Sequence, residues 1–289
     1  MEKQQQNHLK IAKIKNLPTL PETSCRIIAA VNNPDISIEE LTRIVSTSQA
    51  LSGRLLGLAN SAYFGWPGKI GDLRMAIIQV LGLNLVKGLA VSILLSKELD
   101  VSRCPQFDVE QFWARGLLTA TLAQQLTIQL NDEKLSPSVV YTAGLLLNVG
   151  LLAVVFIFPE ELNQVFTNMQ EKDSSLSNEI VDAIGESHFQ IGCFVLKRWR
   201  LPDIFPMVLQ QYGQVECLEQ EQVIKITNLL KICSKLAKDI YFNEDQKVPV
   251  PVSSINQLGL VPTKVQRVVD GLFEKRDNIK DMAISMTGK

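Results

Sequence analysis

The stretch Gly144-Leu-Leu-Leu-Asn-Val-Gly150 lies inside an apolar run that extends from Ala143 to Phe158. This run is short for a membrane span, contains the polar residue Asn148 and stops at Pro159. A buried helix of a folded protein explains these features better than a segment in a bilayer. The sequence therefore predicts a core helix over about residues 137–156.

The sequence on both sides of this stretch is helical almost throughout. Apolar residues recur at helical spacing, as in Leu41, Ile44 and Val45, and no segment sustains the alternation of a strand. Ser37-Ile-Glu-Glu40 is a capping box that predicts a helix start. The sequence thus predicts an all-α protein. Helices are expected at about 22–32, 38–46, 51–60, 73–81, 83–98, 109–130, 137–156, 160–171, 178–185, 188–199, 204–213, 219–241, 253–258 and 263–277.

Two interruptions divide the helical pattern. Ser102-Arg-Cys-Pro-Gln106 breaks it in the middle of the chain, and Lys247-Val-Pro-Val-Pro-Val252 is extended by its prolines. We expect an N-terminal helical bundle over 1–101, a second helical subdomain over 102–245, and a C-terminal extension over 246–289 with short helices and a loose tail from Ile279 to Lys289.

Composition places the protein among soluble globular proteins. Hydrophobic residues make up 46% and charged residues 20% of the 289 residues. The formal net charge of −1 gives no general attraction to phosphate backbones, so nucleic-acid binding is not expected. The five cysteines are scattered and never form a C-x-x-C pair, which argues against a disulfide framework or a zinc knuckle. The N-terminal residues are polar, without the apolar core of a signal peptide. We expect a cytoplasmic protein that does not associate with membranes.

An ordered set of motifs over about residues 15–215 resembles the HDOD domain of bacterial signalling proteins. The motifs are Leu17-Pro18-Thr-Leu20-Pro21, the segment Leu55-Leu-Gly-Leu-Ala-Asn60-Ser61-Ala62-Tyr63-Phe64-Gly65, Phe112-Trp113, Gly144–Gly150, and His188…Gly192…Trp199-Arg-Leu201-Pro202. One departure is Ser48-Gln49, which stands where the family usually has Asp-Pro. The resemblance implies an N-terminal helical bundle packed on a degenerate HD-type helical domain.

The Gly144–Gly150 stretch also resembles the Gly-Leu-Leu-His-Asp-Ile-Gly segment of HD-type metal phosphohydrolases. By this resemblance, the first metal-binding histidine is replaced by Arg115 and the His-Asp pair by Leu147-Asn148. His188 is retained, and the paired histidines fall near Tyr212. Leucine offers no lone pair, a neutral amide is a poor substitute for a carboxylate, and three protein ligands are the usual minimum for zinc. We therefore predict no catalytic residue, no metal and no other cofactor.

The resemblance predicts a vestigial pocket formed by Arg115, Leu147, Asn148, His188 and Tyr212. Arg115 has two interpretations: a cation in a former ligand's place that binds a carboxylate or phosphate, or a surface or internally paired arginine. His188 is either a buried, hydrogen-bonded histidine or a relic ligand in a pocket.

The candidate interaction surface comprises Asn60, Ser61, Tyr63, Phe64 and Trp66. Asn60-Ser61 either ends a helix, since asparagine tolerates the left-handed conformation, or contacts a partner. The aromatic loop either packs back onto the bundle or forms a recognition surface of the kind rich in Trp and Tyr.

These features predict a non-catalytic signalling module that binds a protein partner and has room for a small ligand in the vestigial pocket. No output domain is visible, so we expect it to act in trans. The alternative is a divergent HD-type metal-dependent phosphohydrolase or cyclic-dinucleotide phosphodiesterase that uses Asn148, His188 and nearby acidic residues. A cyclic-nucleotide or nucleic-acid sensor is a third possibility.

Overall fold

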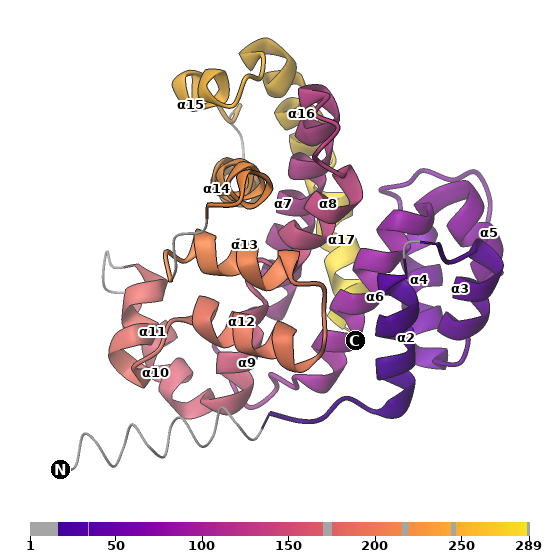
Figure 1. The fold of residues 1–289 in the computed structure, drawn as a ribbon, viewed down its shortest axis with the longest axis horizontal. Coiled ribbons are helices and arrows are strands. Elements are labelled where there is room, and N and C mark those ends of the chain that lie inside the picture. The colour runs from indigo at the N-terminus through magenta and orange to yellow at the C-terminus, as the bar shows by residue number, and fades with distance from the viewer. Residues whose placement is uncertain (1–16, 34, 170–174, 216–218, 244–246, 288–289) are drawn as a thin grey trace.

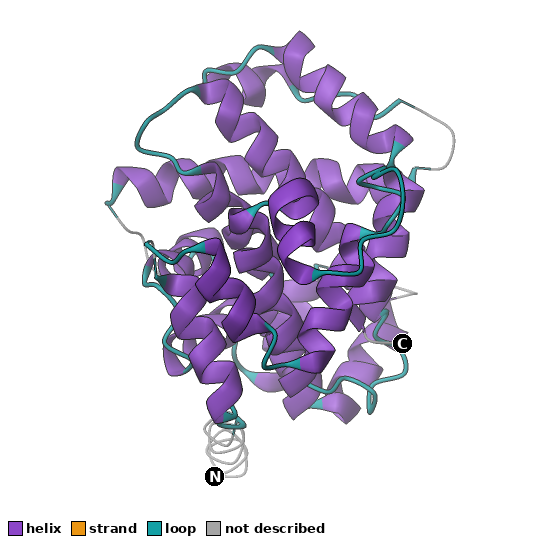
Figure 2. Ribbon diagram, turned by 90° about the vertical axis from the view of Figure 1, so that its right-hand side faces the viewer, coloured by secondary structure: helices purple, strands orange, loops and turns teal. Residues whose placement is uncertain are grey.

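The computed structural model describes residues 17–33, 35–169, 175–215, 219–243 and 247–287, and every regular element in these ranges is a helix (Figure 2). The all-α class predicted from the sequence is confirmed. Figure 1 shows an N-terminal bundle of α2–α6 on one side of a larger helical half that contains α7–α14.

The N-terminal bundle begins where the sequence predicts. Its elements are α2 (Glu22–Asn32), α3 (Ile38–Val45), α4 (Gln49–Ala59), α5 (Leu73–Met75), the π-helix η1 (Ala76–Leu81) and α6 (Leu83–Glu98). Ser37 Oγ accepts a hydrogen bond from Glu40 N–H at 3.1 Å and so caps α3. Ser48 caps α4 in the same way through Leu51 N–H at 3.4 Å. Ser48-Gln49, which stands where the family usually has Asp-Pro, therefore still begins a helix.

The larger half is built around the long helix α7. Its elements are α7 (Val109–Leu130), α8 (Pro137–Leu146), α9 (Val149–Ile157), α10 (Pro159–Met169), α11 (Leu176–Ile184), α12 (His188–Arg198), α13 (Ile204–Tyr212) and α14 (Glu221–Phe242). Helices α8 and α14 pack against α7, while α12 packs against α9 and α13. The Asp108 carboxylate caps α7 by accepting Gln111 N–H at 2.8 Å.

The core helix predicted over 137–156 is interrupted. Helix α8 ends at Leu146 and α9 begins at Val149, because Asn148 adopts φ −106° and ψ 17°. By length and apolar composition alone, Pro137–Ile157 would be long enough to cross a membrane. However, 83% of its most apolar window is buried inside the fold, as expected of a core helix pair.

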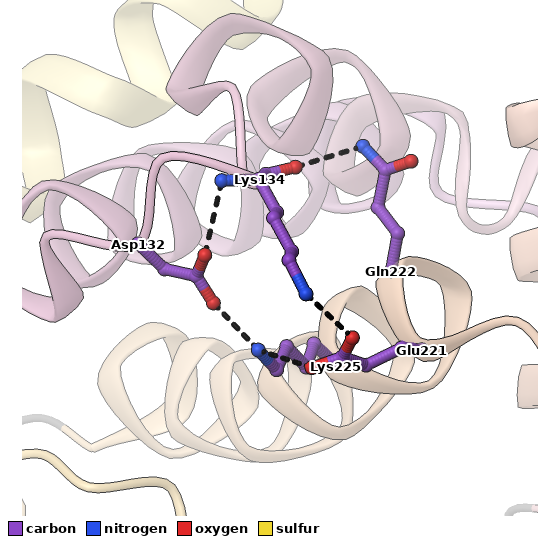
Figure 3. A network of polar contacts seen from close by, with 5 residues as sticks. All are labelled: Asp132, Lys134, Glu221, Gln222 and Lys225. Atoms are coloured by element: carbon purple, nitrogen blue, oxygen red, sulfur yellow. Dashed lines mark hydrogen bonds and ion pairs between the residues drawn. The ribbon is translucent and has the colours of Figure 1, made fainter.

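A polar network fixes the start of α14 to the turn between α7 and α8 (Figure 3). Lys225 Nζ contacts Asp132 Oδ2 at 2.7 Å and Glu221 Oε1 at 2.9 Å, and Lys134 Nζ contacts Glu221 Oε2 at 2.9 Å. Gln222 Nε2 donates to the carbonyl oxygen of Lys134 at 3.0 Å. The hydrogen bond from Lys225 is the largest cause of the lowered pKa of Asp132. These contacts orient α14 along α7, and the C-terminal end of α14 borders the site described below.

The C-terminal segment contains α15 (Val252–Gln257), α16 (Pro262–Glu274) and α17 (Arg276–Thr287). The prediction of a loose tail from Ile279 to Lys289 is wrong for the residues up to Thr287, which are helical. Residues 288–289 lie outside the described residues. Ile279, Met282, Ala283 and Met286 form a buried stripe at helical spacing, so α17 packs firmly. It contacts α7 and also α4 and α6, and thus joins the two halves (Figure 1).

The predicted subdomains share one core. Buried side chains form a single cluster that extends from Leu17 to Met286. The boundary predicted at 101/102 lies in the loop between α6 and α7, and the boundary at 245/246 lies outside the described residues. The halves are therefore structural regions of one folded unit.

Two of the sequence motifs that lie far apart in the chain are joined by hydrogen bonds. Trp199 Nε1 donates to the carbonyl oxygen of Pro18 and Arg198 Nη2 to that of Leu17, each at 3.2 Å. Trp199 itself is only 4% exposed. The motif before α2 and the motif after α12 are thus parts of one contact between the halves.

Candidate functional site

The site begins with a close approach of two helices. A Cβ added at Gly150 would lie 1.7 Å from the carbonyl oxygen of His188 and 2.7 Å from the nitrogen of Gly192. Helices α9 and α12 therefore meet backbone to backbone, which only glycine permits. This contact brings Asn148, at the start of α9, close to His188, at the start of α12.

Beside this contact lies a cavity of about 640 Å³. It is bordered by α7 and the loop before it, and by parts of α9, α10, α11, α12 and α14. Its polar lining residues are Gln106, Asp108, Gln111, Arg115, Asn148 and His188. Phenylalanine rings form much of the rest, so the cavity is amphipathic.

Three of the five residues predicted to form a vestigial pocket line this cavity: Arg115, Asn148 and His188. Leu147 does not, because its side chain is 1% exposed and belongs to the core. Tyr212 is also absent from the lining. Its ring packs against Phe189 at 5.2 Å, and it interacts electrostatically with Arg115. The sequence thus named three of the six polar residues in this lining and missed Gln106, Asp108 and Gln111. Neither periodicity nor the resemblance indicated which way Leu147 points.

Arg115 is a partly desolvated cation. Burial lowers the pKa of its guanidinium from the ordinary value. Its Nε atom is buried without a hydrogen-bond partner, and no ion pair of Arg115 occurs in the described part of the chain. Arg115 is therefore half-buried and makes no ion pair within the described residues, so the internally paired interpretation is not met there.

His188 is buried, as one interpretation held, but it lacks part of the expected hydrogen bonding. The residue is 5% exposed, and its ring packs against Phe189 with the centroids 4.0 Å apart. Nδ1 is buried and has no hydrogen-bond partner within the described ranges. Burial lowers the pKa of His188 to about 4, so the imidazole is neutral at pH 7.

The cavity does not fit a catalytic metal. Among its lining residues only Asp108 and His188 have side chains that commonly bind catalytic metals, and the Asp108 carboxylate already caps α7. Within the described residues, no group of three or more His, Cys, Asp or Glu residues could hold a metal ion. The Arg115 guanidinium would repel a dication placed in the same cavity.

Asn60, which lies in one of the sequence motifs, holds a loop in place through its side chain. Its Nδ2 donates to the carbonyl oxygens of Leu56 and Ile70, and its Oδ1 accepts Ile70 N–H, with all three distances 2.8 Å. Asn60 is the C-cap of α4, as one interpretation held, but its φ of −88° is not left-handed. Ser61 Oγ is buried without a hydrogen-bond partner in the described part of the protein. The side chain of Asn60, rather than its backbone conformation, therefore fixes residues 61–69.

The aromatic loop is divided between core and surface. Tyr63 and Phe64 pack against the core, edge to face with the ring centroids 5.0 Å apart, and Lys275 Nζ lies 5.4 Å from the Tyr63 centroid. Trp66 is 37% exposed. Met75 and Ile78 of the same bundle are also exposed, although no sequence motif predicted them. Their exposure could have been predicted from their outward positions in the short α5–η1 segment.

A family model of the HDOD domain matches residues 17–214. The chain belongs to the HDOD family. An uncharacterized protein of Treponema pallidum is 28% identical over 193 residues, which are 66% of this chain. The match spans only 36% of that relative's length, so the relative is much longer.

Solved structures with similar folds extend over nearly the whole chain. A protein from Shewanella amazonensis named "Putative phosphohydrolase" aligns with a TM-score of 0.76 at 19% identity, covering 96% of this chain and 97% of that one. A "Putative signal transduction protein" from Marinobacter aquaeolei also has a TM-score of 0.76, at 22% identity, and covers 97% of this chain and 66% of that one. At these identities the likeness concerns the fold, which is the HD-type helical fold of the HDOD family.

Proposed function

We propose that this HDOD protein is a non-catalytic signal-transduction module that acts by binding a protein partner. One observation carries the proposal. The cavity that corresponds, by the resemblance, to the metal site of HD-type enzymes is lined here by Arg115 and Asn148. A guanidinium is not a metal ligand, and a neutral amide is a poor substitute for a carboxylate or an imidazole. The cavity chemistry therefore favours binding over metal-assisted hydrolysis.

The N-terminal bundle offers the surface for the partner. Trp66, Met75 and Ile78 are 37%, 43% and 47% exposed and lie within thirteen residues of one another in the sequence. The hydrogen bonds between Asn60 and Ile70 hold the Trp66 loop in one shape, which lowers the entropy cost of binding. Exposed tryptophan is a residue type enriched in interface hot spots.

A capture experiment with matched variants tests this surface. Tagged wild-type protein and the variants Trp66→Ala and Val252→Ala are used as bait in a lysate of the source cells. Val252 is 54% exposed on α15, at the far side of the molecule from α5 (Figure 1). We expect a specific protein that is retained by the wild type and by Val252→Ala and lost with Trp66→Ala, while circular dichroism stays unchanged. Equal retention by all three proteins would refute the surface.

The alternative, a divergent metal-dependent phosphohydrolase, is supported by the fold likeness to the Shewanella protein and by Asp108 and His188 in the cavity. It predicts hydrolysis of bis(p-nitrophenyl) phosphate in the presence of manganese, and loss of that activity on His188→Ala. The non-catalytic proposal predicts no hydrolysis by either protein above the rate of the free metal.

A further inference from the structure

The amphipathic cavity beside Arg115 contains a guanidinium that makes no ion pair to any described residue. We propose that it binds a small molecule with one carboxylate or phosphate group on an aromatic or otherwise apolar body, and that Arg115 holds the anionic group. Binding there does not depend on the partner surface, since the cavity and Trp66 are formed by different elements.

The environment of Arg115 is the first observation that supports an anion site. A partly buried cation without a partner is costly, whereas a bidentate contact with a carboxylate or phosphate offsets its desolvation. Its Nε is buried and makes no hydrogen bond to any described residue. The largest influence on the pKa of its guanidinium is burial, which lowers it, while Tyr212 and Tyr241 act in the opposite direction.

Further polar groups stand beside the proposed anion site. Asn148 presents a neutral amide to the cavity, and its NH₂ group can donate to an anion. His188 is 5% exposed and lines the cavity, with Nδ1 buried and unpartnered among the described residues. A neutral imidazole that carries its proton on Nδ1 donates one hydrogen bond at that atom.

The apolar walls select the rest of the ligand. Phe107 packs against Phe112 at 5.6 Å and against Phe166 at 5.8 Å, measured between ring centroids, and all three rings line the cavity. The volume of about 640 Å³ falls within the usual range for small-molecule sites, roughly 300–1,000 Å³. Such walls favour an aromatic ring or a short aliphatic body.

The acidic lining residue Asp108 limits the ligand's charge. Asp108 precedes Arg115 by seven residues along the chain, about 10 Å along a helix axis. Its carboxylate would repel a second anionic group at that end of the cavity. The cavity therefore favours a molecule with a single anionic group over a polyphosphate.

A pair of fluorescent probes tests the proposal directly. Anilinonaphthalene sulfonate carries one anionic group on an aromatic body, and phenyl-naphthylamine is its neutral analogue. We expect wild-type protein to bind the sulfonate at one site. Arg115→Met should weaken that binding about tenfold or more, the usual effect of losing a hydrogen-bonded charge pair, with little change for the neutral probe. Lys97→Met, which removes an exposed cation of α6, should leave both affinities unchanged.

Competition on the unmodified protein provides a second readout that does not depend on how a variant folds. Benzyl phosphate or phenylacetate should displace the sulfonate probe, and benzyl alcohol should not. Equal affinity of the wild type and Arg115→Met for the sulfonate would overturn the proposal, as would displacement by benzyl alcohol as effective as that by the anions. Trp66→Ala should bind the probe normally, so failure of the ligand site and failure of the partner surface are distinguishable.

Discussion

At the scale of single residues, His188 links the cavity to stability. Its pKa is about 4 in the folded protein, below the ordinary value of 6.5, because burial disfavours the charged ring. The unfolded state therefore binds a proton more readily, and stability falls as the pH drops from about 6.5 to about 4. Above pH 6.5 this residue contributes no pH dependence.

The expected effect of His188 is a loss of at most about 3 kcal/mol in the free energy of unfolding across that pH interval. Arg115 and Asp108 are the charged residues that line the same cavity, and burial is the cause of the lowered pKa of His188. Urea unfolding of wild type and His188→Gln between pH 4 and pH 7 measures it. The curve of the variant should be flatter over this interval. Parallel curves would mean that His188 is not buried as a neutral ring.

Gly150 gives a sharper prediction at the same scale. Gly150→Ala would place a Cβ 1.7 Å from the backbone carbonyl oxygen of His188, so α9 and α12 must separate. We expect a loss of about 3 kcal/mol or more in the free energy of unfolding. Gly53→Ala is the matched control, because Gly53 is exposed within α4 and nothing lies within 4 Å of its added Cβ. This control should gain about 0.5–1 kcal/mol. Similar values for the two variants would refute the close helix contact.

At the scale of elements, α17 acts as a tie between the halves. Met282 is 3% exposed on the face of α17 that packs inward, and Ile284 is 41% exposed on the same helix. Met282→Ala should cost about 2–5 kcal/mol in a single unfolding transition, since both halves share its contacts. Ile284→Ala should change stability by less than about 0.5 kcal/mol. If Met282→Ala proves equally neutral in urea unfolding, residues 276–287 are a loose tail after all.

Sequence patterns predict some helix boundaries well and miss others. Helix starts with explicit caps, such as Ser37 before α3, were predicted well because capping is a local property. The break at Leu147-Asn148 was missed because periodicity is uninformative in a run that is apolar on all sides. The stripe in α17 follows the same spacing rule as the other helices and could have been read from the sequence.

At the scale of the whole molecule, the fold class and the resemblance were predictable, and the arrangement of the cavity only partly so. The motif positions indicated that Arg115, Asn148 and His188 would meet, because the HD-type fold brings those positions together. The inward packing of Leu147 depends on contacts between helices distant in sequence. So does the division of the aromatic loop, with Tyr63 packed inward and Trp66 exposed.

We propose that Arg115 and Asn148 replace a metal site in this cavity. Elemental analysis of the protein, purified without a histidine tag and dialysed against a weak chelator, tests it most directly. We predict iron, manganese and zinc each well below one equivalent per chain. Near-stoichiometric metal that falls away in His188→Ala would contradict this proposal, because it would require ligands to converge on His188 in a cavity that we assign to an anion.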